Sequence, residues 1–135
     1  MAFMTWDEKY SLKMKKVDKQ HQHLFELINR LHEAVVTGEE RTTLADILDE
    51  LIDYTVEHFQ TEEKLFEEHN YPEYDMHKKE HDDLTKKVLE LQTQFGEGSA
   101  TISFEVLDFL NDWLLNHTLH SDQKYSLYLH DRGVF

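Results

Sequence analysis

Apolar residues recur at three- and four-residue intervals along four long segments, which is the pattern of amphipathic α-helices. In the first segment, Leu24, Ile28, Leu31 and Val35 fall on one helical stripe. The alternation of apolar and polar residues that marks strands is absent from the sequence. Gly and Pro occur at few places and so set the expected helix ends. We expect helices from about Asp18 to Thr37, from an N-cap at Thr42 or Thr43 to about Glu68, from just after Pro72 to Gly96, and a fourth that starts after Gly98–Ser99.

Helices of roughly 18–27 residues would each be about 27–40 Å long, and short connections between them favour antiparallel neighbours. The sequence therefore predicts an all-α fold, an antiparallel up-down-up-down four-helix bundle. The first 17 residues, which include Trp6 and Tyr10, precede the first helix and are expected to pack across it as an N-terminal arm. We expect a single domain over residues 1–135.

The chain contains 28 acidic and 14 basic residues, so its formal net charge is −14. Binding to phosphate backbones or anionic lipid depends on clustered Lys and Arg, so we expect no nucleic-acid partner and no membrane insertion. The N-terminus lacks a basic segment followed by an apolar run, and no stretch approaches the roughly 18 apolar residues of a membrane span. This predicts a soluble, cytoplasmic protein. Cysteine is absent, so a metal site would have to use His, Asp or Glu.

Ten histidines are many for an acidic chain of this length, and several extend the apolar stripes. Stepping back from Leu24 by one helical turn, for example, reaches His21. A buried polar group without a partner costs a few kcal/mol, so several of them on the inward side are expected to bind one another or a common ligand. The polar residues that the stripes place on the inward side are His21, His58, Glu62, His77, His81, His117 and Asp122.

The spacing of these residues brings donors together within single helices. His58 and Glu62 are four residues apart and therefore only about 40° apart around a helix. His117 and Asp122 are five apart, about 140° on a regular helix, so we expect the last helix to loosen or end between them. His120 would compete with Asp122 if that helix were regular. We favour Asp122, because a bridging carboxylate balances the charge of a metal.

A lone inward histidine is more often a hydrogen-bonded core residue than a ligand, but seven aligned donors favour a metal site. We interpret Gln20 and Tyr125 as candidate hydrogen-bond partners of the ligands. The residues expected at the surface or in loops are His23, His32, His69, His130, Glu63 and Glu67.

Five imidazoles and two carboxylates exceed what one metal ion can coordinate, so two ions fit better. If Glu62 and Asp122 both bridge the pair together with one solvent-derived oxygen, each ion receives three oxygens and the histidines divide three and two. One ion is then six-coordinate, and the other is five-coordinate with an open position that can bind a ligand. The donors suit iron, while zinc, copper and manganese remain open on ligand type.

Four motifs, one in each predicted helix, combine these residues in a specific order. They are Asp18-Lys19-Gln20-His21, His58-Phe59-x-x-Glu62-Glu63, His77-x-x-x-His81 and Trp113-Leu114-x-x-His117-x-x-x-x-Asp122-x-x-Tyr125. Together with Trp6 near the N-terminus, they resemble the hemerythrin family, in particular its single-domain bacterial members. The resemblance implies a non-haem di-iron centre with an oxo or hydroxo bridge that binds O2 reversibly. It implies a protein for oxygen storage, delivery or sensing, with a protein acceptor of the oxygen as a further partner, and not an enzyme.

The resemblance also implies a role for each site residue. The coordinatively saturated iron would be held by His77, His81 and His117, the O2-binding iron by His21 and His58, and both by bridging Glu62 and Asp122. The implied oxygen pocket comprises Leu24, Phe59, Trp113, Leu114 and Thr118. Thr118 departs from the branched aliphatic residue that usually follows the last histidine of the family, which makes the pocket more polar.

Other functions of the same residues remain open at this point. A di-iron oxidase or peroxidase of the ferritin-like kind uses two Glu-x-x-His motifs plus two further Glu residues, and the seven inward residues contain no such motif. A nitric-oxide- or peroxide-handling enzyme would use the same site. A metal-storage or zinc-binding module is a third alternative.

Overall fold

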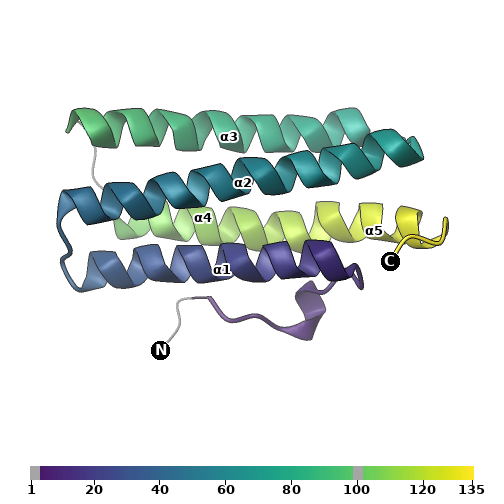
Figure 1. Ribbon diagram of the computed structural model, residues 1–135, viewed down its shortest axis with the longest axis horizontal. Helices are drawn as coiled ribbons and strands as arrows, with labels where there is room; N and C mark the ends of the chain where they lie inside the picture. Colours follow the sequence, from purple (N-terminus) through teal and green to yellow (C-terminus); the bar gives the residue numbers. More distant parts are fainter. Residues whose placement is uncertain (1–3, 99–101) are drawn as a thin grey trace.

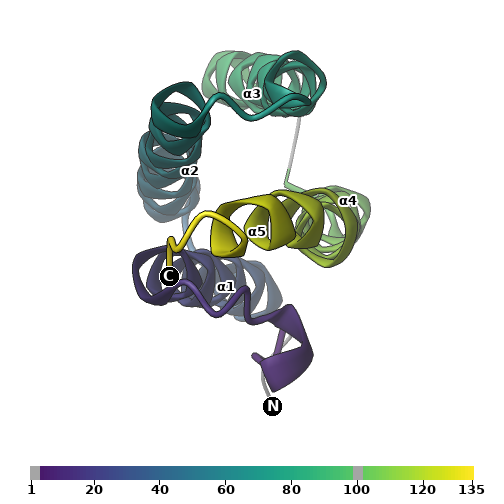
Figure 2. The same cartoon turned by 90° about the vertical axis from the view of Figure 1, so that its right-hand side faces the viewer.

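The structure, a computed structural model, describes residues 4–98 and 102–135 and shows the antiparallel four-helix bundle that the stripes predict (Figure 1). A short 3-10 helix, η1 (Glu8–Tyr10), precedes the bundle. The bundle consists of α1 (Lys15–Val36), α2 (Arg41–His69), α3 (Tyr74–Glu97) and α4 (Phe104–Asn116), which continues through the π-helical segment η2 (His117–Asp122) into α5 (Gln123–His130). The end view in Figure 2 shows α1 beside α2 and α2 beside α3, and α1 also contacts α4. No strand occurs in these two described ranges.

The start of α2 differs from the expected one for a tertiary reason. The helix begins at Arg41 after Glu40, and neither Thr42 nor Thr43 caps it, so the predicted N-cap was wrong. The Arg41 guanidinium lies over the Phe95 ring, 4.0 Å from its centroid, and donates a hydrogen bond to the Phe95 carbonyl oxygen. This contact with the end of α3 fixes the first residue of α2, and local capping preferences do not encode it.

The fourth helix starts after Gly98–Ser99, as predicted. It begins at Phe104, where the side chain of Ser103 caps it by accepting a hydrogen bond from the Val106 N–H. Gly98 instead follows the end of α3 in the left-handed conformation, with φ 79°, which glycine adopts without strain. Ser99 lies outside the described residues.

The N-terminal arm packs along α1, as predicted (Figure 1). The rings of Trp6 and Tyr10 each meet Phe25 of α1 edge-on, with centroids 5.4 Å apart. Further along α1, Asn29 donates to and accepts from the backbone of Met4, at 2.8 and 2.6 Å. The arm thus covers one face of α1 through aromatic and hydrogen-bonded contacts.

The junction between the arm and α1 is held by Asp18. The helix begins at Lys15, three residues earlier than predicted, and the Asp18 carboxylate accepts hydrogen bonds from the Ser11 hydroxyl and the Leu12 N–H, at 2.5 and 2.8 Å. At the end of α5, His130 is half-buried and not simply a surface residue, because its Nε2 lies 2.7 Å from the Leu12 carbonyl oxygen. The end of α5 therefore contacts the junction between the arm and α1.

A layer of buried polar residues divides the core into two apolar clusters. The major cluster contains Met4, Tyr10, Leu24, Phe25, Leu27, Ile28, Leu31, Ala34, Ile47, Leu48, Leu51, Ile52, Phe59, Leu84, Val88, Phe95, Ile102, Leu107, Leu110 and Leu114. The minor cluster contains Leu12, Met14, Val17, Phe66, Tyr71, Tyr125 and Leu129. Along α2, Phe59 belongs to the major cluster and Phe66 to the minor one, and the buried Glu62 lies between them. The polar layer therefore crosses the bundle between the two clusters.

Within the described ranges, no helix combines the length and apolar character that a membrane crossing requires. The expected cytoplasmic location stays a prediction, as does the single domain over residues 1–135.

Candidate metal centre

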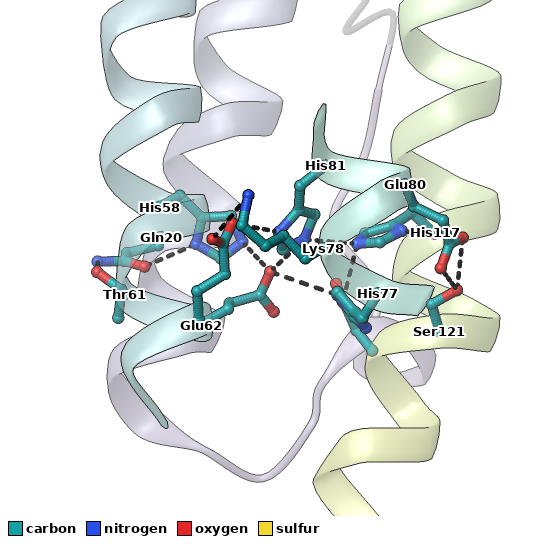
Figure 3. A network of polar contacts seen from close by, with 12 residues as sticks. Gln20, His58, Thr61, Glu62, His77, Lys78, Glu80, His81, His117 and Ser121 are labelled. Atoms are coloured by element: carbon teal, nitrogen blue, oxygen red, sulfur yellow. Dashed lines mark hydrogen bonds and ion pairs between the residues drawn. The ribbon is translucent and has the colours of Figure 1, made fainter. Parts of the chain in front are cut away.

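The seven polar residues that the stripes place inward all lie in the buried layer, each at most 5% exposed. They come from all four helices of the bundle: His21 from α1, His58 and Glu62 from α2, His77 and His81 from α3, and His117 and Asp122 from η2. Figure 3 shows the side chains of Glu62, His77, His81 and His117 turned toward one another. Helical periodicity was sufficient to find the five histidines and Glu62. Asp122 was preferred to His120 because a bridging carboxylate balances the charge of a metal.

The seven donors form two overlapping groups, in each of which one ligand atom per residue lies within 4.8 Å of the others. The three-histidine position comprises His77, His81, His117, Glu62 and Asp122. The two-histidine position comprises His21, His58, Glu62 and Asp122. The two carboxylates belong to both groups, so the two positions lie side by side. This is the same division that the family resemblance implies.

The π-helical segment brings the donors of the last helix together. In η2, hydrogen bonds run from residue i to i+5, so residues five apart lie above one another. His117 Nε2 is accordingly 3.2 Å from Asp122 Oδ1, although a regular α-helix would separate them. His120 is exposed, whereas Asp122 is fully buried. The loosening of the last helix between His117 and Asp122 is thus confirmed, and it takes the form of a π-turn.

Carboxylates back two histidines of the three-histidine position, which means that a carboxylate oxygen outside the donor set lies near the Nδ1 atom of the ring. Glu63 Oε2 lies 3.1 Å from His81 Nδ1, and the Glu63 side chain is only 19% exposed, so its predicted solvated position was wrong. Glu80 Oε1 lies 3.6 Å from His117 Nδ1. Both pairs join residues of different helices, and no spacing within one helix could have found them.

A neutral amide backs the two-histidine position. Gln20 Oε1 lies 2.6 Å from His58 Nδ1, as its interpretation as a hydrogen-bond partner predicts. His21 is fully buried, and neither of its ring nitrogens has a hydrogen-bond partner. The two positions therefore differ in the groups behind their imidazoles as well as in the number of histidines.

Burial and neighbouring charge act in opposite directions on the titratable groups of the layer. Burial and the Asp122 carboxylate raise the pKa of Glu62, but the neighbouring imidazoles, chiefly His58, outweigh both and hold that pKa below its ordinary value. Burial lowers the pKa of His117, yet Asp122 and Glu80 raise it to about 10. Burial keeps the pKa of His58 below its ordinary value. The raised pKa favours the protonated form of His117 when no cation is bound, and a metal ion would compete with that proton.

The unpaired polar atoms of the layer test whether a metal pair fits. Ten buried side-chain atoms among the described residues lack a hydrogen-bond partner, and eight of them belong to the seven predicted ligands. His21 Nε2 and Asp122 Oδ2, for instance, are 3.1 Å apart without hydrogen-bond geometry. Each unpaired buried group costs about 1–3 kcal/mol, so a hydrogen-bonded core does not account for these residues. Imidazole and carboxylate donors with shared carboxylates fit a pair of divalent ions such as iron.

A small apolar cavity adjoins the layer on the side of the major cluster. Its volume is ≈ 30 Å³, which exceeds the roughly 10–15 Å³ that one water needs. The predicted pocket residues Leu24, Phe59, Trp113 and Leu114 all line it. The Phe59 ring stacks on His81, and the Trp113 ring stacks on His117, with centroids 3.8 and 4.4 Å apart. Two residues of the cavity wall therefore contact donor imidazoles directly.

Two buried hydroxyls near the layer also lack partners. Thr118, the fifth predicted pocket residue, is fully buried but is not among the residues that line the cavity. Tyr125 is fully buried, with its ring 5.4 Å from that of His77. Burial, followed by the charge of Glu62, raises the pKa of Tyr125 well above its ordinary value. The Tyr125 hydroxyl is thus held neutral beside the donor cluster.

The comparisons with known proteins agree with the fold and with this donor set. The sequence profile of the Hemerythrin HHE cation binding domain matches residues 13–127. Two proteins named bacteriohemerythrin, from Methylococcus capsulatus and Stenotrophomonas maltophilia, are each 36% identical over 93% of this chain, which covers 95% and 81% of their lengths. A crystal structure of wild-type hemerythrin superposes with a TM-score of 0.89 at 36% identity and covers 93% of this chain and 96% of its own. The chain belongs to the hemerythrin family.

Proposed function

We propose that this chain binds O2 reversibly at a non-haem di-iron centre with an oxo or hydroxo bridge, in oxygen storage, delivery or sensing. The observation that carries the proposal is the pair of overlapping, fully buried donor groups that share two carboxylates. One iron would be held by His77, His81 and His117, the other by His21 and His58, and both by Glu62 and Asp122. Bound ferrous iron would supply the electrons that an O2 complex requires.

The protein's contribution is an unequal pair of positions beside a dry space. The two-histidine position offers four protein donors and the three-histidine position five, so an added ligand finds room at the former. The adjoining cavity is lined almost entirely by apolar side chains, and Thr55 is its one polar lining residue. Apolar walls exclude water and anions that would promote loss of the bound oxygen.

We infer that the chain carries O2 and is not an enzyme. A ferritin-like oxidase surrounds its metals mainly with carboxylates, whereas this site has five imidazoles and two carboxylates. Neutral imidazoles donate less charge than carboxylates, which favours reversible binding over cleavage of the O–O bond. A protein acceptor that receives the oxygen is part of the same proposal.

The decisive experiment is the visible spectrum of the iron-loaded protein through repeated cycles of air and deoxygenation. We expect an absorption band that appears in air and disappears when O2 is removed, with the O2 recovered at an electrode. A one-way change without recoverable O2 would instead favour the oxidase alternative. Metal analysis of protein from native cells should find about two iron ions per chain, and about two zinc ions without iron would favour a zinc-binding module.

A further inference from the structure

Two of the three imidazoles of the three-histidine position, His81 and His117, are backed by negative charge. Glu63 Oε2 lies 3.1 Å from His81 Nδ1, which is hydrogen-bond distance. Glu80 Oε1 lies 3.6 Å from His117 Nδ1, which is a charge contact without a hydrogen bond. The Ser121 hydroxyl holds the Glu80 carboxylate by donating to it, at 2.8 Å from one oxygen and 2.9 Å from the other. Two carboxylates from outside the donor set thus face this position.

The two-histidine position is backed by a neutral group. Gln20 accepts a hydrogen bond from His58 Nδ1 through Oε1, at 2.6 Å, and donates through Nε2 to the Thr61 hydroxyl oxygen, at 3.3 Å. The contact with Thr61 fixes which end of the amide faces His58. His21, the second imidazole here, has no hydrogen-bond partner on either nitrogen. The imidazoles of this position therefore have no carboxylate behind them.

The two kinds of backing have different effects on a metal ligand. A group that accepts the Nδ1 proton fixes the tautomer and leaves the Nε2 lone pair for the metal, whether the group is an amide or a carboxylate. A carboxylate also raises the basicity of the imidazole and adds negative charge near the cation. Loss of such a partner commonly reduces metal affinity by about 10–100-fold. The amide orients its ligand without this added attraction.

We propose that Glu63 and Glu80 are positioning residues that make the three-histidine position the tighter of the two, so that it fills first and empties last. Gln20 orients His58 but leaves the two-histidine position weaker and more readily emptied. The inference rests on the proposed metal centre and goes beyond it by ranking the two positions and naming the residues that set the rank.

Titration of the metal-free full-length chain with Zn²⁺, followed by calorimetry, tests the ranking without iron redox chemistry. We expect two distinguishable binding steps in the unaltered protein. His58→Ala should remove the weaker step and leave the stronger, which assigns each step to its position. Glu63→Gln keeps an acceptor for His81 but removes the charge, so it should weaken the first step by about 10–100-fold.

Three further variants separate charge from structure. Gln20→Glu should strengthen the second step, because it gives the two-histidine position the carboxylate that it lacks. Glu80→Gln should weaken the first step by less than Glu63→Gln, because its contact is longer. Glu67→Gln is the matched control: Glu67 lies one turn beyond Glu63 on α2, is exposed, and accepts a hydrogen bond from Tyr74. It should leave both steps unchanged.

The d–d absorption of bound Co²⁺ provides a spectroscopic readout that a merely structural role would not move. We expect Glu63→Gln to change the spectrum of the first equivalent, and Gln20→Glu that of the second. Failure of the unaltered chain to bind zinc or cobalt would overturn the metal centre itself. If the unaltered chain binds two ions but Glu63→Gln leaves the first step unchanged, only the ranking is overturned. The same holds if Glu67→Gln weakens the first step as much as Glu63→Gln does. Circular dichroism of the metal-free variants checks their folding, and Glu80→Gln keeps the test open if Glu63→Gln does not fold.

Discussion

The two sides of the buried polar layer are filled differently. Toward the major cluster, Phe59 and Trp113 stack on donor imidazoles and border the cavity of ≈ 30 Å³. Toward the minor cluster, Phe66 meets His77 and Tyr125 edge-on, with centroids 4.8 and 4.9 Å apart. The same donors therefore face a partly empty apolar space on one side and interlocking aromatic rings on the other. A small apolar ligand finds room on the first side, while the second fixes the donors in place.

Metal binding in the layer should have the largest effect on stability, because neither apolar cluster offers hydrogen-bond partners to the polar atoms that lie between the clusters. Binding to the folded state alone stabilises by about 4 kcal/mol per ion when free metal is 1,000-fold above its Kd. We expect chelation to lower the melting temperature strongly. His117→Ala should strongly reduce this metal dependence, because it removes a donor of the three-histidine position, whereas His120→Ala, in the same π-helical segment but exposed, should retain it. Thermal melts with and without metal measure the difference, and equal behaviour of the two variants would mean that His117 holds no metal.

A matched pair of substitutions on α2 compares the two sides directly. Phe59 and Phe66 are two helical turns apart, both are buried, and each contacts a donor imidazole. Phe→Ala in a core costs about 3–5 kcal/mol. We expect Phe66→Ala near the top of this range and Phe59→Ala near the bottom, because Phe59 already borders a void and loses fewer contacts. Denaturant unfolding gives both values, and the reverse order would contradict the assignment of the cavity side as the less tightly packed one.

The pH dependence of stability should report on the buried layer, because His117 has a strongly shifted pKa there. In the metal-free protein the pKa of His117 is raised from 6.5 to about 10, so the stability that its charge provides is fully present below pH 6.5 and is lost as the pH rises toward 10. The slope is on the order of 1 kcal/mol per pH unit. Above pH 7 the lowered pKa of His58 adds no opposing change.

Metal should reverse the sign of this dependence at lower pH, because ligands must lose protons to bind a cation. The melting temperature of the metal-loaded protein should therefore rise between about pH 5 and 8, while that of the metal-free protein falls above pH 7. His117→Gln should flatten the decline of the metal-free protein. A metal-free protein whose stability does not fall between pH 7 and 10 would show that His117 is not charged there.

The sequence predicted the position of a side chain wherever that position depends on a single helix. The stripe through Leu24 locates His21, and the four-residue step from His58 locates Glu62, because the helical period alone decides which side a residue takes. The five-residue gap before Asp122 even predicts that the last helix must loosen, although not that it forms a π-turn. These inferences need no knowledge of neighbouring helices.

Contacts between helices were beyond reach of the same reasoning. Glu63 follows Glu62 directly and was expected in solvent, yet it turns to His81 on α3. Arg41 starts α2 by stacking on Phe95 rather than through a local cap. Both depend on how one helix is rotated against another, which the period within a single helix does not specify.

Replacement of Thr118 has the smallest expected effect on stability. It tests whether the polar layer extends beyond the seven predicted metal ligands. Its hydroxyl is fully buried without a partner, whereas Thr55 Oγ1, on the border of the cavity, donates to the Leu51 carbonyl oxygen at 2.7 Å. Thr118→Val keeps the shape and removes the unpaired group, so it should stabilise the protein by about 1 kcal/mol. Thr55→Val breaks a hydrogen bond and should be neutral or destabilising by up to about 1 kcal/mol. Denaturant unfolding of the metal-free and loaded forms measures both. If Thr118→Val destabilises only the loaded form, the hydroxyl serves the occupied site, and the polar layer includes Thr118 as well as the seven donors.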